Sequence, residues 1–299
     1  MDIQRILHLL PPTLRRHKLI RALTFLHPKA RIQRVQFNSN AEVLVDVREA
    51  TFRQLLIMAE FDPEYFRIAS AFLRTGGIYF DVGANAGLCS FGLIPFCPKV
   101  EYHLFEANPR LWGILRQSME LHNDVNMHLV EGAVGERDGF VCLDAENPDG
   151  DIGQGFICEG DTIRTHMLTL DEYIQTTGIP RVEFAKMDIE GYEFQAIEGS
   201  REAIRAGKLP VIYFELKRPL VERFGKSPGE VLDRFRSLGY ILYHVRNQDF
   251  AMITAPRNVD ICGLQVAPVT SYPCDLWTDL LAVHESATHN LLLQTAKLI

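Results

Sequence analysis

The sequence lacks the usual marks of disulfide scaffolds, zinc ribbons and membrane spans. Its six cysteines form no Cys-x-x-Cys pair, so we expect reduced thiols in a cytoplasmic protein. No apolar run approaches the roughly 18 residues that a membrane helix needs, and the N-terminus has no compact apolar core typical of a signal peptide. None of the ten histidines shows the spacing of a metal-binding pair, so we expect no metal site.

A net positive charge occurs only in the first 34 residues, because acidic residues outnumber basic ones in the rest of the chain. These 34 residues include eight basic residues and one acidic residue, a net charge of +7, which leaves −14 for the rest of the chain. The acidic remainder argues against nucleic acid as a partner. Within the basic segment, apolar residues at positions 3, 6, 7 and 10 have helical spacing. This stripe predicts a helix that either packs on the acidic body or contacts an anionic membrane surface peripherally.

Strand-like and helix-like segments alternate from residue 78 onward. We expect strands near 78–82, 101–106, 126–134, 182–191, 210–216, 240–245 and 261–267, with helices from about 87 and over 109–122, 192–206 and 228–238. This alternation predicts an α/β fold with a doubly wound, mainly parallel sheet. The Gly- and Asp-rich segment 143–161 is expected to form a hairpin or a loop over one face. Ligands of such sheets bind at the carboxyl ends of the strands.

The first of these strand ends, "IYFDVGANAGLCSF" at 78–91, combines a carboxylate with a turn of small residues. A dinucleotide fingerprint would place a third glycine where Leu88 stands, and Asp81 would repel a pyrophosphate. S-adenosylmethionine carries a sulfonium and an amino group but no phosphate, so we favour it over a nicotinamide cofactor. Glu106 ends the next strand, 21 residues after Asn85. It either accepts the ribose hydroxyls of the ligand or caps the helix that opens at Pro109.

A second polar cluster interrupts "FAKMDIEGYE". A central parallel strand should be continuously apolar, and buried charges are costly unless they are paired or used. We favour Asp188 as a general base and Lys186 as the group that orients it or stabilises alkoxide charge, with Glu190 and Glu215 as the next candidates for the base. The alternatives are a structural Lys186–Asp188 ion pair, favourable charge at a helix start for Glu190 and Glu193, and carboxylates that hold Mg²⁺, which we do not favour.

Several motifs together resemble the FkbM-type S-adenosylmethionine-dependent methyltransferases. They are "FDVGANAGLCS", "FEANP", "EGAVGERDG", "LTLDEYI", "AKMDIEGYEFQAIEGS" and "IYFEL", and they cover roughly residues 60–220. The resemblance implies a class I, Rossmann-like methyltransferase fold and O-methylation of a hydroxyl on a sugar, a glycan or a secondary metabolite. By motif match it makes these residues the candidate cofactor site: Asp81, Gly83, Asn85, Gly87, Glu106 and Ala133.

With this resemblance, we divide the chain into three parts. Residues 1–50 form a basic N-terminal extension with a hairpin, residues 51–268 the methyltransferase domain, and residues 269–299 a C-terminal tail. The alternative functions are a catalytically silent module that binds S-adenosylmethionine and, less favoured, a nicotinamide-dependent oxidoreductase.

Overall fold

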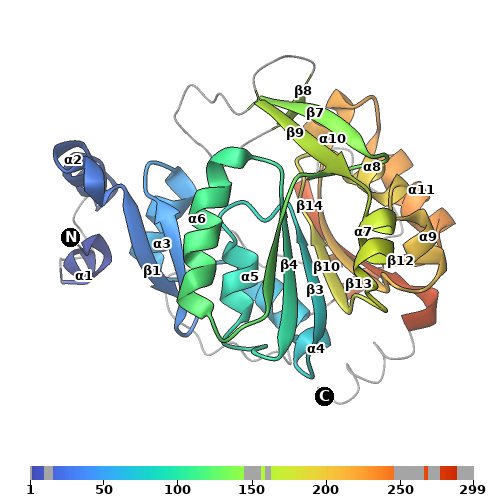
Figure 1. The fold of residues 1–299 in the computed structure, drawn as a ribbon, viewed down its shortest axis with the longest axis horizontal. Helices are drawn as coiled ribbons and strands as arrows, with labels where there is room; N and C mark the ends of the chain where they lie inside the picture. Colours follow the sequence, from blue (N-terminus) through green and yellow to red (C-terminus); the bar gives the residue numbers. More distant parts are fainter. Residues whose placement is uncertain are drawn as a thin grey trace.

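An eight-stranded sheet forms the centre of the protein (Figure 1). The structure is a computed structural model that describes residues 2–9, 16–144, 156–158, 163–245, 266–268 and 277–287. Its strands are β3 (Gly77–Val82), β4 (Val100–Glu106), β5 (Met127–Glu131), β10 (Phe184–Met187), β11 (Val211–Lys217), β12 (Tyr240–Val245), β13 (Val266–Pro268) and β14 (Trp277–His284). They are arranged in the order β13-β12-β14-β11-β10-β3-β4-β5. The five strands from β11 to β5 are parallel, which confirms the expected mainly parallel sheet.

Strand β14 differs from our expectation, because the sequence analysis placed it in a tail outside the domain. It lies in the interior of the sheet and is antiparallel to both β11 and β12. Its residues alternate between the two cores: Leu280 packs on one face of the sheet and Leu281 on the other. The run "DLLAV" therefore has the continuous apolar character of a strand buried on both faces. A boundary at residue 268 would separate this strand from its sheet.

Helices cover both faces of the sheet, as the doubly wound fold requires (Figure 1). One face carries α4 (Pro63–Leu73), α5 (Leu88–Leu93) and α6 (Pro109–Met119); the other carries α7 (Leu170–Thr177), α8 (Glu193–Glu198), α9 (Arg201–Arg205), α10 (Arg218–Arg223) and α11 (Pro228–Ser237). The expected helix 192–206 is divided into α8 and α9, and Gly199, which lies between them, is in close contact with the backbone of Gly135. The expected helix 109–122 ends as a 3₁₀ turn, η2 (Glu120–His122).

A second, smaller sheet follows the carboxyl end of β5. It contains β6 (Ala133–Val134), β7 (Gly139–Asp144), β8 (Phe156–Cys158) and β9 (Ile163–Leu168) in the order β6-β9-β7-β8. The expected strand 126–134 is thus two strands in two sheets. Strands β7 and β8 pair as an antiparallel hairpin, which confirms the hairpin expected around 143–161, although residues 145–155 and 159–161 lie outside the described residues. The small sheet lies near the polar strand ends, at the top of Figure 1.

The N-terminal segment packs on the helical face that carries α4 to α6. It consists of α1 (Ile3–His8), α2 (Arg16–Leu26), the 3₁₀ turn η1 (Pro28–Ala30), the antiparallel hairpin of β1 (Ile32–Phe37) and β2 (Ala41–Asp46), and α3 (Ala50–Met58). The hairpin is confirmed, with positive φ angles at all three turn residues 38–40. Side chains of the hairpin, such as Val35 and Phe37, belong to the same core as α5.

Two apolar side chains of helix α1 are buried against the rest of the N-terminal segment. Ile3 and Leu7 are fully buried, the Ile3 amide donates to Gln33 Oε1 at 3.0 Å, and Gln4 Nε2 donates to the Gln36 carbonyl at 2.8 Å. Packing of this stripe on the rest of the protein is therefore confirmed for positions 3 and 7, whereas Ile6 is 36% exposed and position 10 lies outside the described residues. No helix in the described part of the chain is long and apolar enough to span a bilayer.

Candidate functional site

Three charged side chains meet at the carboxyl ends of the neighbouring strands β3 and β10. Lys186 lies opposite Asp81 in the parallel register. Its Nζ atom is 3.4 Å from Asp81 Oδ1 and 3.6 Å from Asp188 Oδ2, and it donates to the Gly83 carbonyl at 3.2 Å. Asp81 is fully buried and also accepts a hydrogen bond from Ser90 Oγ of α5 at 2.6 Å. The structure thus brings three predicted site residues and the Gly83 turn together.

Burial and ion pairing shift the pKa values of Asp81 and Lys186 in opposite directions. Burial raises the pKa of Asp81, against the attraction of Lys186 and the hydrogen bond from Ser90. For Lys186, burial lowers the pKa, but Asp81 and other neighbours outweigh it, and the net result is a pKa well above the ordinary value. Lys186 therefore remains an ammonium ion at neutral pH. It can donate hydrogen bonds and stabilise negative charge, but it cannot act as a base.

The turn after β3 is held in a conformation that excludes side chains. Gly83 and Gly87 both have φ of +81°, and a Cβ atom would overlap the Asp188 carbonyl at Gly83 and the Phe91 ring at Gly87. Asn85 adopts a positive φ of +54° despite its side chain. Positive φ at a residue other than glycine costs energy and is concentrated at ligand sites. The small residues of "VGANAG" thus allow the turn to lie against β10.

Glu106 connects this turn with the end of β4. Its Oε2 accepts from the Asn85 amide at 2.6 Å, and its Oε1 accepts from the Asn108 amide at 2.7 Å. Glu106 is 7% exposed, and burial raises the pKa of its carboxyl group to about 7. The alternative in which Glu106 caps α6 is wrong, because Asn108 is the capping residue and its side chain accepts from the Arg110 amide.

Ala133, the last of the predicted cofactor residues, begins β6 and is 4% exposed. The amide of the preceding Gly132 donates to the Glu106 carbonyl at 3.0 Å. The start of the small sheet is therefore joined to the same strand end as the Glu106 carboxylate.

The remaining catalytic candidates differ in their accessibility. The Asp188 side chain is 37% exposed. Glu215 forms an ion pair with Lys217, with 2.6 Å between Oε2 and Nζ, and both side chains are mostly buried. Glu190 has φ of +56°, and burial followed by repulsion from Asp188 raises its pKa. The Asp188 side chain is therefore more accessible than that of Glu215.

Two further acids lie at this edge of the sheet and were not predicted from the sequence. Asp279 of β14 lies opposite Glu215, and burial, with repulsion from Asp62 and Glu215, raises its pKa to about 8. Asp62 caps α4 by accepting from the Tyr65 amide at 3.1 Å, directly before Pro63 in the first turn of the helix. The apolar run that follows Asp279 was the signal that could have identified β14 and placed this acid.

Glu193 supports the turn that carries Asp188 and Glu190. It is 2% exposed, and its Oε1 accepts from the Ile189 amide at 3.2 Å and the Gly191 amide at 3.3 Å. Within the described residues, its Oε2 is buried without a hydrogen-bond partner. Burial raises the pKa of this group to about 8, so its carboxyl is mainly protonated at neutral pH.

This protonation predicts a pH dependence of stability. The folded-state pKa of Glu193 lies above its ordinary value of 4.5, so the folded state binds the proton more tightly than the unfolded state. The free energy of unfolding should therefore fall as the pH rises from about 5 to about 8, by at most about 1.4 kcal/mol per pH unit for this group. Glu193→Gln imitates the protonated carboxyl and should reduce this fall. Thermal unfolding at pH 5.5 and 7.5 measures it.

The matched control is Glu120→Gln at an exposed carboxylate, which should leave the pH dependence of the melting temperature as it is in the unmodified protein. An equal fall in melting temperature for Glu193→Gln and the unmodified protein would contradict the assignment.

Solved structures that resemble this chain include several methyltransferases. The precorrin-6y C5,15-methyltransferase of Geobacter metallireducens aligns with a TM-score of 0.38 and 13% identity, over 74% of this chain and 86% of that one. The fibrillarin of Aeropyrum pernix, solved in complex with S-adenosyl-L-methionine, aligns with a TM-score of 0.38 and 12% identity, over 74% of this chain and 76% of that one. The strand order of the sheet itself defines the fold.

Sequence comparison identifies the family. The 2-O-methyltransferase NoeI of Sinorhizobium fredii is 24% identical over 166 residues, which cover 50% of this chain and 67% of that protein. The model of the methyltransferase FkbM domain matches residues 81–242, more than half of the chain. This range begins at Asp81 and includes every residue that we predicted for the cofactor and for catalysis. The chain belongs to the FkbM family of S-adenosylmethionine-dependent methyltransferases.

Proposed function

We propose that the protein transfers a methyl group from S-adenosylmethionine to a hydroxyl oxygen of a sugar, a glycan or another small-molecule acceptor. The observation that carries the proposal is the position of Asp188, whose partly exposed carboxylate lies 3.6 Å from the Lys186 ammonium at the strand end beside the Gly83 turn. The relative from Sinorhizobium fredii is named a 2-O-methyltransferase, which supports a hydroxyl acceptor.

The proposed cofactor site fits the chemistry of S-adenosylmethionine. Glu106 offers a buried carboxylate at the end of β4, where it can accept hydrogen bonds from ribose hydroxyls. Asp81 and its partner Lys186 lie beneath the turn, and the positive φ angles of Gly83, Asn85 and Gly87 set the shape of the backbone that would face the ligand. Ala133 contributes a small side chain at the start of the second sheet. The cofactor supplies an activated methyl group when bound.

Methyl transfer forms a bond from the acceptor oxygen to the methyl carbon while the bond from that carbon to sulfur breaks, and the acceptor loses its proton. A hydroxyl is a weak nucleophile, so a base at the acceptor oxygen is needed. We assign this role to Asp188, with Lys186 holding the carboxylate and stabilising negative charge on the oxygen. Glu190 and Glu215 are the next candidates, although Lys217 already pairs with Glu215. Asp279 is a further candidate for the base, because it lies opposite Glu215 in the register of β11 and β14.

The proposed base predicts a specific loss of activity. Asp188→Asn keeps the shape of the side chain but cannot take the proton, so kcat should fall by about 10²- to 10⁴-fold. Affinity for S-adenosylmethionine should stay within about twofold, because the lost interaction matters mainly in the transition state. The measurement is formation of S-adenosylhomocysteine with a pool of sugars and cell metabolites as acceptors, together with calorimetric titration of the cofactor.

Asp233→Asn, at an exposed acid of α11, is the matched control and should leave both quantities unchanged. Near-normal turnover in a folded Asp188→Asn variant would reject the assignment and direct the same substitution to Glu190, Glu215 and Asp279. Cofactor binding without turnover on any acceptor in the pool would instead favour the catalytically silent module.

The cofactor site predicts a graded loss of affinity at Glu106. Glu106→Ala removes a charged acceptor of hydrogen bonds, which should cost on the order of 1.5–3 kcal/mol, or roughly tenfold to a hundredfold in Kd. Because this carboxylate also holds the Asn85 and Asn108 amides, Glu106→Gln is the second variant: it retains one acceptor oxygen and should lose less. Calorimetric titration with S-adenosylmethionine and S-adenosylhomocysteine measures both variants. Unchanged affinity in Glu106→Ala would remove the basis for placing the ribose there.

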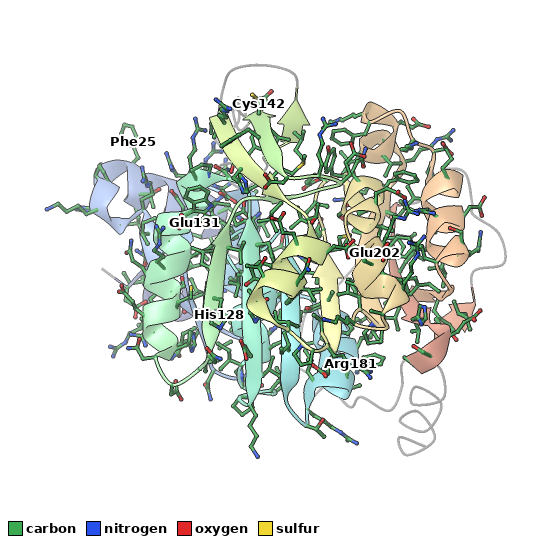
Figure 2. The ribbon with its side chains drawn as sticks, turned by 45° about the vertical axis from the view of Figure 1, so that its right-hand side comes forward. Phe25, His128, Glu131, Cys142, Arg181 and Glu202 are labelled. Carbon is green, nitrogen blue, oxygen red and sulfur yellow. The ribbon has the colours of Figure 1, made fainter. Side chains whose placement is uncertain are left out.

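We further propose that the N-terminal segment contacts an anionic membrane surface through α2 rather than α1. Phe25 and Leu26 at the end of α2 are 84% and 68% exposed, and Phe25 projects away from the body (Figure 2). Exposed basic residues accompany them, namely Lys18, Arg21 and Lys29. Apolar side chains beside bases suit the boundary between acyl chains and anionic headgroups. Such a contact would bring the enzyme to a lipid-linked acceptor.

This contact predicts salt-sensitive sedimentation with vesicles. The protein should pellet with phosphatidylserine-containing vesicles at low salt and much less at high salt, because exposed charges are screened. Phe25→Ser with Leu26→Ser should reduce the pelleted fraction at low salt by at least about threefold. The control is Phe140→Ser on β7, where the ring is 61% exposed. Equal pelleting of the α2 variant and the control, or no pelleting of the unmodified protein, would end the membrane proposal.

A further inference from the structure

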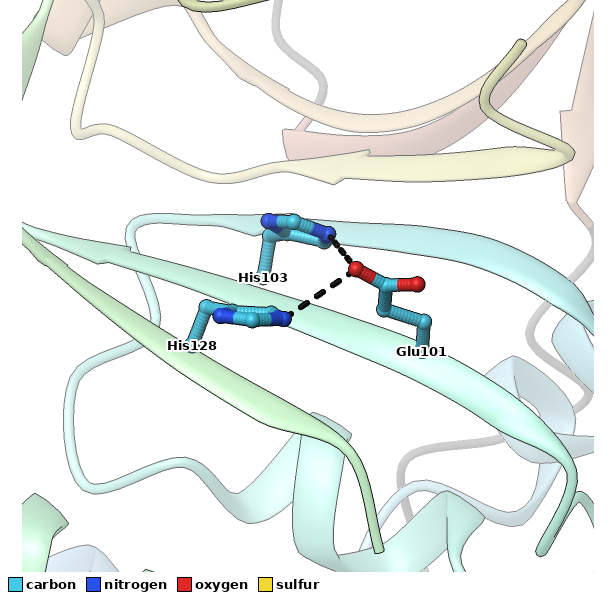
Figure 3. A group of neighbouring side chains, drawn as sticks. All are labelled: Glu101, His103 and His128. Atoms are coloured by element: carbon cyan, nitrogen blue, oxygen red, sulfur yellow. Dashed lines mark hydrogen bonds and ion pairs between the residues drawn. The ribbon is translucent and has the colours of Figure 1, made fainter. Parts of the chain in front are cut away.

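Two histidines and a glutamate come together on β4 and β5, away from the proposed cofactor site. His103 and His128 lie directly opposite each other in the parallel register of these strands. Glu101 lies two residues before His103 on the same face of β4, since side chains alternate along a strand. Figure 3 shows both imidazoles directed at the same carboxylate oxygen. No spacing along the chain reveals this cluster, because His128 comes from a different strand.

The separations of the three polar atoms suit a small metal ion. Glu101 Oε1 is 3.1 Å from His103 Nε2 and 3.1 Å from His128 Nε2, and one atom from each residue lies within 4.8 Å of the other two. A tetrahedral zinc ion with bonds of about 2.0–2.1 Å holds its ligand atoms about 3.3 Å apart. Small side-chain rotations therefore suffice for these three atoms to surround one ion.

The surroundings of His103 orient its ring for metal binding. Its side chain is 4% exposed, and its Nδ1 is 2.7 Å from the hydroxyl of Tyr173 on α7. This hydrogen bond occupies the inner nitrogen, so the outer Nε2 faces Glu101. Metal-ligating histidines commonly have such a partner on the second ring nitrogen, which fixes the orientation of the ring.

The other two side chains are accessible. The Glu101 side chain, on β4, is 36% exposed. The His128 side chain, on the edge strand β5, is 45% exposed. The two imidazole rings are stacked, with their centroids 4.6 Å apart and their planes at 22°. To converge on one ion the rings must turn relative to each other, and the exposed ring of His128 is free to do so. Water can complete the coordination from the solvent side.

The cluster is separate from the candidate active site. Glu101 lies at the beginning of β4, whereas Glu106 ends the same strand. His103, the member of the cluster nearest to Glu106 along β4, lies three residues before it, which is about 10 Å of extended strand. An ion at the cluster would therefore lie beyond bonding distance of Glu106 and of the Gly83 turn.

We propose that Glu101, His103 and His128 form a binding site for a divalent transition-metal ion of the zinc type, with water as a further ligand. Two imidazoles and one carboxylate are a donor set that suits zinc. The ion would join β5, the edge strand, to β4 and to the ring held by α7. Its effect would be to stabilise this edge of the sheet.

The experiment uses the full-length protein after dialysis against EDTA. Titration with Zn²⁺, followed by calorimetry, should show one saturable site per chain, and titration with Co²⁺ should give the visible absorption bands of a four-coordinate complex with nitrogen and oxygen ligands. His128→Ala and Glu101→Gln should each weaken Zn²⁺ binding by at least about tenfold. At a Zn²⁺ concentration about a hundredfold above Kd, the melting temperature should rise by about 5 °C, and this rise should disappear in His128→Ala.

The matched control is His166→Ala, which removes another half-exposed histidine that contacts a single carboxylate, Asp138, at 2.9 Å. It should retain the Zn²⁺ affinity of the unmodified protein. Circular dichroism confirms that each variant folds without metal. The proposal is overturned by the absence of a saturable site, by equal Zn²⁺ affinity in His128→Ala and His166→Ala, or by near-ultraviolet charge-transfer bands of Co²⁺ that indicate cysteine ligands.

Discussion

The ammonium group of Lys186 connects the two halves of the proposed active site. On one side it neutralises Asp81, a fully buried carboxylate. On the other side it reaches Asp188, and between them it holds the carbonyl of Gly83. Removing one member of a buried ion pair leaves an uncompensated charge and costs about 3–5 kcal/mol. The proposed cofactor turn and the proposed base therefore share Lys186 as their common partner.

Much of this arrangement could be predicted from the sequence. The alternation of strands and helices gives the doubly wound sheet, and a polar residue at the end of an apolar strand indicates a ligand site, because parallel strands end together at one edge. That reasoning identified Asp81, Glu106, Lys186 and Asp188, and the structure places them at neighbouring strand ends. The small residues of the turn also have a clear physical reason, since side chains at Gly83 and Gly87 would overlap neighbouring atoms.

The contacts that were not predicted from the sequence depend on the pairing register of the strands and on which element packs against each face of a helix or strand. Asp279 joins the acidic edge only because β14 inserts antiparallel beside β11, and the pairing of His103 with His128 follows from the register of β4 and β5. The helical stripe of α1 was recognised, but its periodicity does not reveal whether the partner is a protein core or a lipid surface. Local pattern thus predicts the faces of an element, while tertiary packing decides what each face contacts.

The position of β14 also has a consequence for how the molecule assembles. This strand separates β11 from β12, although both precede it in the chain. While the chain emerges from the ribosome, helix α11 and β12 are therefore available before the strand that attaches β12 to the rest of the sheet. Insertion of β14 between β11 and β12 is expected to be a slow folding step, because it forms contacts between residues that are distant in sequence. Until then the edge of β11 is unpaired and open to intermolecular strand pairing, so the nascent protein depends on its last described strand for protection against aggregation.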